Sequence, residues 1–133
     1  MAYLIDSDWV IDHLSNIPTA VDLLTRLARD GIAVSIITYM ETYQGILRSP
    51  NSMAAEAALD AFVHAVPVLT ISQAVARRCA QLRETLRVQG RRVNQRALDL
   101  VIAATALEHD LMIVTRNRED YSDIPTLQVY QPN

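Results

Sequence analysis

The sequence of 133 residues contains no lysine, and all twelve of its basic residues are arginine. A receiver-like signalling domain, a small α/β fold that binds Mg²⁺ and accepts phosphate, depends on a lysine at its site, so this absence argues against that class. The sequence also has a single cysteine, Cys79, which cannot form an internal disulfide. No Cys/His cluster has the spacing of a zinc site, so we expect Cys79 to be a small core residue.

Long apolar runs are missing as well. No stretch approaches the roughly 18 apolar residues that a membrane span needs, and the first residues, MAYLIDSD, lack the basic and apolar regions of a signal peptide. With 50% hydrophobic and 20% charged residues, the composition is that of an ordinary globular protein. We therefore expect one cytoplasmic domain, residues 1–133, that does not associate with a membrane.

One carboxylate stands where an apolar residue would be expected. Asp99 lies inside the run LDLVIAATAL, in a segment that reads as a helix. Moving an ionised carboxylate out of water costs several kcal/mol or more unless it is hydrogen-bonded or binds a cation. Asp99 is therefore the strongest candidate for a functional residue in the chain.

Short apolar strands alternate with helical segments along the sequence. This alternation indicates an α/β fold whose mainly parallel sheet of about five strands is covered by helices on both faces. Ser7 or Asp8 is expected to cap the first helix, and Thr38 the third. The predicted strands are 3–5, 32–37, 66–69, 111–115 and 127–130, and the predicted helices are 8–14, 18–29, 38–49, 51–63, 73–89 and 94–109.

Polar residues follow these strands at the end where parallel sheets bind their ligands. Asp6 ends the first strand, Glu41 lies in the first turn of the helix after the second, and Asp99 lies near the start of its own helix. From Asp99 this helix descends about 15 Å, and the strand 111–115 climbs about the same distance back, which brings Asn117 and Asp120 level with Asp99. Carboxylates this close raise one another's pKa, and a divalent cation such as Mg²⁺ or Mn²⁺ neutralises them. The sequence therefore predicts a metal site.

Each of these residues also has a structural explanation. Asp6 can cap the helix that follows it, and Glu41 matches a capping box in which it returns to the amide of Thr38. Asn117 and Asp120 lie in a polar loop where turn formation is the ordinary role of such residues. Two further acids, Asp8 and Asp12, either belong to the site or favour the dipole at the start of a helix.

The arginines are unevenly distributed. Seven of them fall within twenty residues that contain a single acid, Glu84, although the net charge of the chain is −3. This basic segment is either a stripe that faces RNA or DNA phosphates or a solvated helix face. The seven residues are Arg77, Arg78, Arg83, Arg87, Arg91, Arg92 and Arg96.

Taken together, these features resemble the PIN domain family and, within it, the VapC ribonuclease toxins of bacterial toxin–antitoxin pairs. The resemblance covers nearly the whole chain. Its ordered motifs are YLIDSDWVID, ITYMETYQGI, RALDLVIAATALEHDLMIVTRN and TRNREDY. The chain departs from the family pattern at Ser7-Asp8, which replaces the more usual Thr-Asn, and at Tyr121, where Phe is frequent.

The resemblance implies that Asp6, Glu41 and Asp99 form a catalytic acidic triad that binds Mg²⁺ or Mn²⁺. The fourth acidic position falls on Asn117, a neutral residue, with Asp120 as the alternative. A cation held there would activate water for attack on an RNA phosphodiester, frequently of tRNA, and stabilise the leaving oxygen. The family also implies a homodimer and a cognate VapB-like antitoxin. The arginines expected to hold RNA phosphates are Arg83, Arg87, Arg91, Arg92, Arg96, Arg116 and Arg118.

Two alternatives remain within this family. The neutral Asn117 is compatible with a degenerate PIN domain that binds RNA or a partner protein without cleaving RNA. A housekeeping PIN ribonuclease without an antitoxin would share every motif quoted above. The sequence specifies neither the RNA target nor the number of metal ions.

Overall fold

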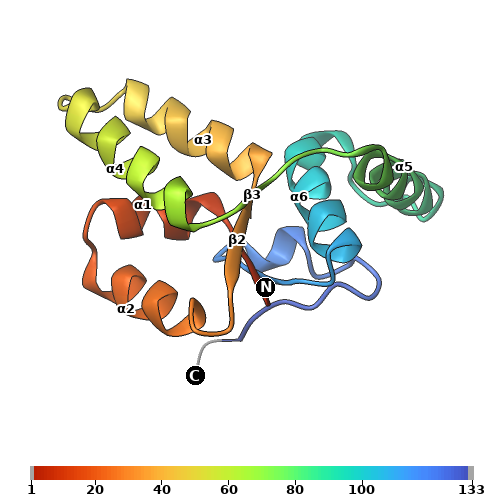
Figure 1. Ribbon diagram of the computed structural model, residues 1–133. Helices are drawn as coiled ribbons and strands as arrows, with labels where there is room; N and C mark the ends of the chain where they lie inside the picture. The colour runs from red at the N-terminus through yellow and green to blue at the C-terminus, as the bar shows by residue number, and fades with distance from the viewer. Residues whose placement is uncertain (1, 132–133) are drawn as a thin grey trace.

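The computed structural model, which describes residues 2–131, is built on a parallel sheet of four strands (Figure 1). The strands are β1 (Tyr3–Ile5), β2 (Ile32–Ser35), β3 (Val68–Leu69) and β4 (Met112–Val114), and they lie in the order β3-β2-β1-β4. Tyr3 is aligned with Ile32 on one side and with Met112 on the other. Because β1 and β4 are parallel neighbours, the residues that follow them meet at one edge of the sheet.

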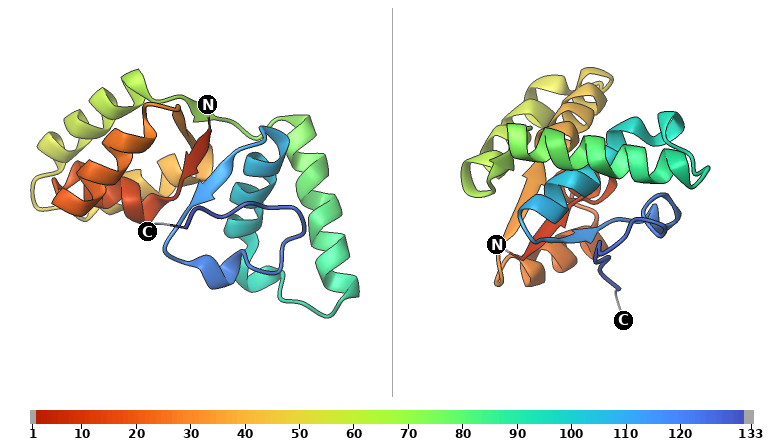
Figure 2. Two further views of the ribbon diagram at one scale, coloured as in Figure 1. Left: turned by 90° about the horizontal axis from the view of Figure 1, so that it is seen from below. Right: turned by 90° about the vertical axis from the view of Figure 1, so that its right-hand side faces the viewer.

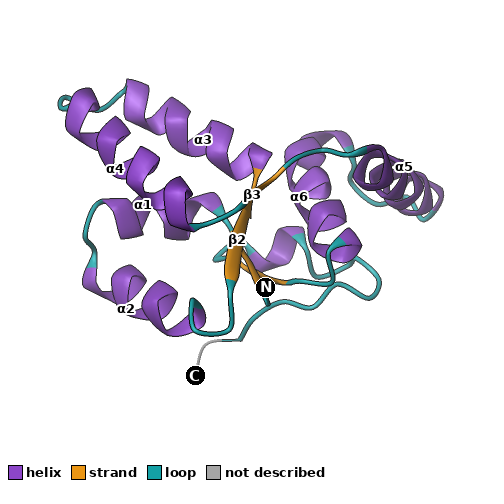
Figure 3. Ribbon diagram, in the orientation of Figure 1, coloured by secondary structure: helices purple, strands orange, loops and turns teal. Residues whose placement is uncertain are grey.

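Helices cover both faces of this sheet, as the sequence predicted. The first four lie on one side of it and the last two on the other (Figures 1 and 3). The α-helices are α1 (Ser7–Leu14), α2 (Pro18–Leu27), α3 (Ile36–Leu47), α4 (Ser52–Ala65), α5 (Gln73–Val88) and α6 (Ala97–Glu108), and the short 3₁₀ helices are η1 (Asn94–Arg96) and η2 (Arg118–Asp120).

The strands are apolar on both faces, which is why a sheet between two helical layers is stable. Successive side chains of a strand point to opposite faces. On β1, Leu4 belongs to the core cluster that includes the buried residues of α5 and α6, whereas Ile5 belongs to the cluster with those of α1 and α2. Cys79 is buried in the first of these clusters, as expected of a small core residue. No helix within residues 2–131 is both long and apolar enough to span a membrane.

Helix α3 begins two residues earlier than predicted. Ser35 is its N-cap, and the Ser35 hydroxyl accepts a hydrogen bond from the backbone N–H of Thr38 at 3.0 Å. Thr38 is therefore inside the helix and is not the cap that the sequence predicted, and Glu41 lies in the second turn instead of the first. The alternative explanation of Glu41 as the partner of a Thr38 capping box is excluded with it. The apolar run 32–37 concealed this boundary, because Ile36 and Ile37 continue the pattern of the strand into the helix.

Two other predicted boundaries also change. Asp6, rather than Ser7 or Asp8, is the N-cap of α1. The predicted final strand, residues 127–130, is reduced to a single parallel bridge between Ile113 and Val129, with this segment running beside β4 (Figure 2). The Ile113 backbone pairs with it, donating to the carbonyl of Gln128 and accepting from the N–H of Tyr130. Within residues 2–131 the sheet therefore has four strands and one bridge, close to the sheet of about five strands that was expected.

Candidate active site

Asp6 is anchored where β1 and β4 end. Its side chain is buried, with one oxygen accepting from the backbone N–H of Ser7 at 2.8 Å and the other from the Thr115 hydroxyl at 2.7 Å. Thr115 directly follows β4, and its hydroxyl oxygen also accepts from the backbone N–H of Asn117. One oxygen of Asp6 thus caps α1, and the other is held by the residue that follows β4. Capping the helix therefore does not remove Asp6 from the predicted site.

Burial makes the charge of Asp6 costly. Its pKa is raised to about 6, mainly by burial, while the hydrogen bonds from Thr115 and Ser7 act in the opposite direction. The neighbouring charges of Asp8 and Asp99 raise this pKa further. A carboxylate that is held by two donors and still resists ionisation lies in a site where a positive charge would be strongly favoured.

Glu41 faces the same centre from α3. Burial is the largest cause of its raised pKa, and the charges of Asp99 and Asp8 add to it, whereas a hydrogen bond with the Ser7 side chain opposes it. Because Ser35 caps α3, the Glu41 carboxylate is not used at the helix terminus. From the sequence, Asp8 has either a place in the site or a role at the helix dipole. In the structure, its charge raises the pKa of both Asp6 and Glu41.

Asp99 approaches from the other side of the sheet, in the first turn of α6. It is partly buried, and its pKa is raised first by burial and then by the charge of Asp120. The Tyr121 hydroxyl donates to Asp99 Oδ1 at 3.3 Å and lowers this pKa. The structure therefore places Asp6, Glu41 and Asp99 at one edge of the sheet, each from a different part of the chain.

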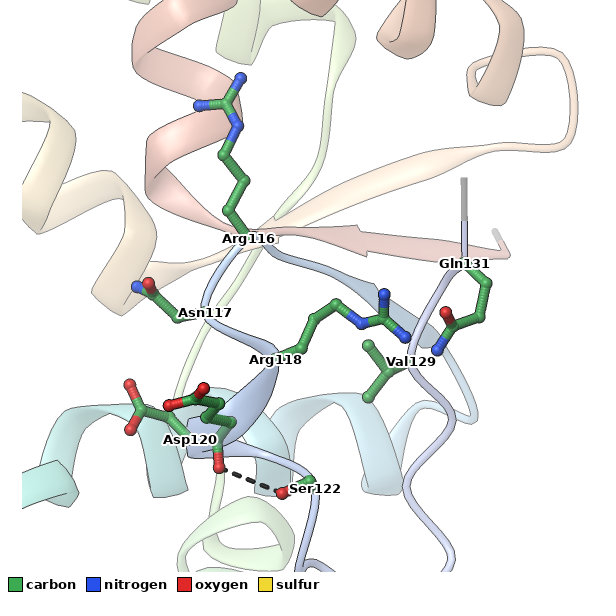
Figure 4. A pocket seen from close by; sticks show the side chains of 8 residues that line it. Arg116, Asn117, Arg118, Asp120, Ser122, Val129 and Gln131 are labelled. Carbon is green, nitrogen blue, oxygen red and sulfur yellow. Dashed lines mark hydrogen bonds between the residues drawn. The ribbon is translucent and has the colours of Figure 1, made fainter. Parts of the chain in front are cut away.

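The loop after β4 carries both candidates for the fourth position. The charge of Asp120 raises the pKa of Asp99, and the Asp120 carboxylate also accepts a hydrogen bond from Arg92 at 3.4 Å. Asn117 is exposed and lines an open groove of about 710 Å³ together with Arg118 (Figure 4). Asp120 lines the same groove, so the geometry does not choose between the two residues, and the role of either in binding a metal ion stays a prediction.

The donor set fits a hard divalent cation. Mg²⁺ and Mn²⁺ prefer oxygen ligands, and all three acids offer carboxylates whose mutual repulsion such an ion would remove. Within residues 2–131, no three acidic, histidine or cysteine side chains are yet close enough together to form a complete metal cluster. Mg²⁺ usually keeps several of its waters, so it does not need a closed cage of protein ligands.

The arginines of the basic segment are not equivalent. Arg83 on α5 donates to Asn94 at 3.4 Å, and Arg87 forms an exposed pair with Glu84. Arg91 and Arg92 lie exposed in the connection that follows α5. These four keep the prediction of a phosphate-facing surface open.

Arg96 has a different place. Its guanidinium group is buried and forms two parallel hydrogen bonds with the Asp123 carboxylate, at 2.7 and 2.8 Å. It also donates to the backbone carbonyls of Arg92 and Asp120. The structure therefore removes Arg96 from the set of RNA-binding candidates, because its donors are used inside the fold.

The side chains of Arg116 and Arg118 have different surroundings, although the two residues are only two positions apart. Arg116 lies over the Trp9 ring at 3.9 Å and pairs with Asp12 of α1 at 2.7 Å, so Asp12 serves this ion pair. Figure 4 shows Arg118 on the opposite side of the loop, extending toward Val129 and Gln131. Arg116 is thus already engaged by Trp9 and Asp12, and Arg118, which is exposed and lines the groove, is the better candidate for a phosphate at this edge.

Sequence reasoning missed two residues of the site, Thr115 and Tyr121. Thr115 ends a predicted strand and Tyr121 lies in a polar loop, so neither violates a local pattern. The available signal was a hydroxyl-bearing residue directly after a buried strand and an aromatic residue within a charged turn. Only the fold shows that both hydroxyl groups reach carboxylates far away in sequence.

A four-stranded parallel sheet with acids gathered beyond its strand ends defines the class of protein. The chain belongs to the PIN domain family, whose model matches residues 3–126. It is similar to ribonuclease VapC19 of Mycobacterium tuberculosis, with 33% identity over 94% of this chain and 96% of that protein. It is 28% identical to the tRNA(fMet)-specific endonuclease VapC of Shigella flexneri, over 96% of each chain.

The fold is also similar to that of solved structures. The DNA-bound VapBC complex of Salmonella typhimurium contains a chain that superposes with a TM-score of 0.85 at 25% identity, covering 98% of this chain and 97% of that one. The predicted α/β class and the resemblance to VapC-type PIN proteins are therefore confirmed.

Proposed function

We propose that this protein is a metal-dependent endoribonuclease and the toxin of a toxin–antitoxin pair. The observation that carries the proposal is the meeting of Asp6, Glu41 and Asp99 at one sheet edge, where burial raises the pKa of all three. The VapC relatives, two of which are named as ribonucleases or endonucleases above, support the reaction class.

In this proposal Asp6, Asp99 and Glu41 hold Mg²⁺ or Mn²⁺, with Asp120 or Asn117 as the fourth group. When bound, the cation supplies positive charge for the phosphoryl oxygens and lowers the pKa of water. Thr115 and Ser7 hold Asp6 in place, so this carboxylate does not have to reorganise when substrate arrives. Glu41, in the second turn of α3, is assigned to ligation or to orienting the attacking water.

The proposed substrate class is RNA, with tRNA favoured because one relative is named for cleaving it. The proposed partner is a VapB-like antitoxin, by analogy with the toxin–antitoxin complexes that share the fold. A homodimer, which the family resemblance implies, stays a prediction. An enzyme acting on tRNA would work in the cytoplasm.

Metal removal tests the proposed reaction. We expect the purified protein to cleave a pool of tRNA in Mg²⁺ or Mn²⁺, to stop in excess EDTA, and to recover when the metal is restored. Cleavage is followed by gel electrophoresis of end-labelled RNA. Undiminished cleavage in EDTA would refute the metal-dependent mechanism, and intact RNA under every metal condition would refute the nuclease assignment.

The arginine surface gives a separate prediction about RNA binding. Changing Arg83, Arg87 and Arg91 to alanine should weaken RNA binding and reduce the slope of log K against log salt by about 2, because each phosphate contact to a single strand contributes about 0.7. The matched control changes Arg26, Arg29 and Arg48, which are exposed in the first half of the chain. Both triple variants lose three positive charges, so equal slopes would show a plain solvated helix face.

A further inference from the structure

Tyr121 is the largest fully buried side chain of the described residues, yet it ends in a polar group. Its ring packs in the core cluster with Leu100 and Ile113, and its hydroxyl points to Asp99 Oδ1 at 3.3 Å. A carboxylate can only accept a hydrogen bond, so the phenol is the donor. The acidic centre therefore receives a neutral donor from a loop that is far from α6 in sequence.

The hydroxyl reaches more than one acid electrostatically. Besides Asp99, to which it is hydrogen-bonded, the charges of Asp6 and Glu41 also act on Tyr121. Among residues 2–131, Asp99 accepts a side-chain hydrogen bond from Tyr121 alone, and this bond occupies Oδ1. Oδ2 is left as the oxygen available to a cation.

The segment that carries Tyr121 is fixed on both sides of it. The Arg96 guanidinium group donates to the backbone carbonyl of Asp120 on one side and to the carboxylate of Asp123 on the other. Arg96 also binds the carbonyl of Arg92, which ties the loop to the connection between α5 and α6. This connection leads directly into α6, which carries Asp99. Arg96 therefore holds the Tyr121 loop against the start of the helix that bears Asp99.

We propose that Tyr121 is a positioning residue for the metal centre: its hydroxyl restrains Asp99 through Oδ1, and the Arg96–Asp123 pair holds the loop that delivers it. The inference rests on the proposed function and names a residue that supports one of the ligands. Groups that hydrogen-bond to metal ligands fix their orientation, and losing them typically costs 10- to 100-fold in metal affinity or activity. At 3.3 Å the bond is long for two oxygens, so it guides Asp99 without locking it.

The test is Mn²⁺ binding to the full-length, RNA-free protein, measured by calorimetry for wild type, Tyr121→Phe and the control Tyr130→Phe. Phenylalanine keeps the buried ring and removes only the hydroxyl. Tyr130 packs edge-on against Tyr3 and makes the corresponding change away from the acids. We expect the half-saturating Mn²⁺ concentration to rise about tenfold in Tyr121→Phe and to stay unchanged in Tyr130→Phe.

Cleavage kinetics separate positioning from substrate contact. In Tyr121→Phe, kcat should fall at low Mn²⁺ and recover at saturating Mn²⁺, while KM for RNA stays at the wild-type value. An unchanged Mn²⁺ affinity, or a raised KM for RNA instead, would overturn the inference. If Tyr121→Phe lost its near-ultraviolet circular dichroism, Asp123→Asn would replace it in the test, since it releases the loop and should also weaken Mn²⁺ binding.

The two proposals fail in different ways. A wild-type protein that binds Mn²⁺ but leaves RNA intact would refute the proposed function, and the comparison of tyrosine variants would still decide the role of Tyr121. A wild-type protein that binds no Mn²⁺ would refute both.

Discussion

Replacing Asp99 with asparagine is expected to lower kcat/KM for RNA cleavage by about a thousandfold, which corresponds to about 4 kcal/mol of lost transition-state stabilisation. Asparagine keeps the size of the side chain and an oxygen that can accept the Tyr121 bond, but it removes the negative charge. Asp99 lies in the first turn of α6 and interacts with the other acids of the centre. Initial rates at saturating Mn²⁺, with Mn²⁺ binding measured in parallel, test this result.

The matched control is Asp110→Asn. Asp110 is exposed just beyond α6 and has a φ of 55°, a backbone conformation that asparagine tolerates well. The control variant should cleave RNA at the wild-type rate, because it removes one negative charge from the surface only. Full activity in Asp99→Asn would show that the acids at the sheet edge do not perform the reaction.

Replacing Arg96 with methionine should lower the free energy of unfolding by about 3 kcal/mol, because removing one partner of a buried ion pair leaves the other uncompensated. The side chains of Arg96 and Asp123 are 3% and 18% exposed, and two backbone carbonyls lose their donor as well. For a domain of this size the melting temperature should fall by roughly 10 °C. Urea unfolding followed by circular dichroism gives the same quantity independently.

Arg87→Met provides a closely matched comparison. Arg87 also forms two parallel bonds with one carboxylate, that of Glu84, at 2.9 and 2.6 Å. This pair is exposed on α5, where solvent and salt screen the charges, so its loss should leave the melting temperature within experimental error. A similar loss of stability in both variants would mean that burial does not distinguish the two pairs.

The acids of the candidate site could be predicted because each interrupts an apolar pattern or follows the end of one. Asp99 interrupts an aliphatic helix, Asp6 ends a strand, and Glu41 lies in the helix that follows the next strand, so the α/β topology directs them to one edge. Their catalytic and metal-binding roles stay predictions until the variants are measured. The start of α3 was missed because Ile36 and Ile37 suit a strand and a helix equally, and only the Ser35 cap marks the boundary.

The arginines show the limit of local reasoning. In the sequence, Arg96 is one member of a basic run and cannot be distinguished from Arg91 or Arg92. In the structure, Arg96 is buried against Asp123, which is 27 positions later. No helical or strand period reports a partner at that separation, because such a contact depends on how two loops meet.

The order and spacing of apolar and acidic residues, by themselves, determined a parallel α/β fold with carboxylates at the ends of its strands, because periodicity and strand direction are local properties of the chain. Only the tertiary structure decided which arginine is structural, that the charge of Asp120 acts on Asp99, and that the Thr115 and Tyr121 hydroxyls support the acids. Each of these contacts joins segments distant in sequence, and burial between packed layers, rather than residue type, fixes their partners.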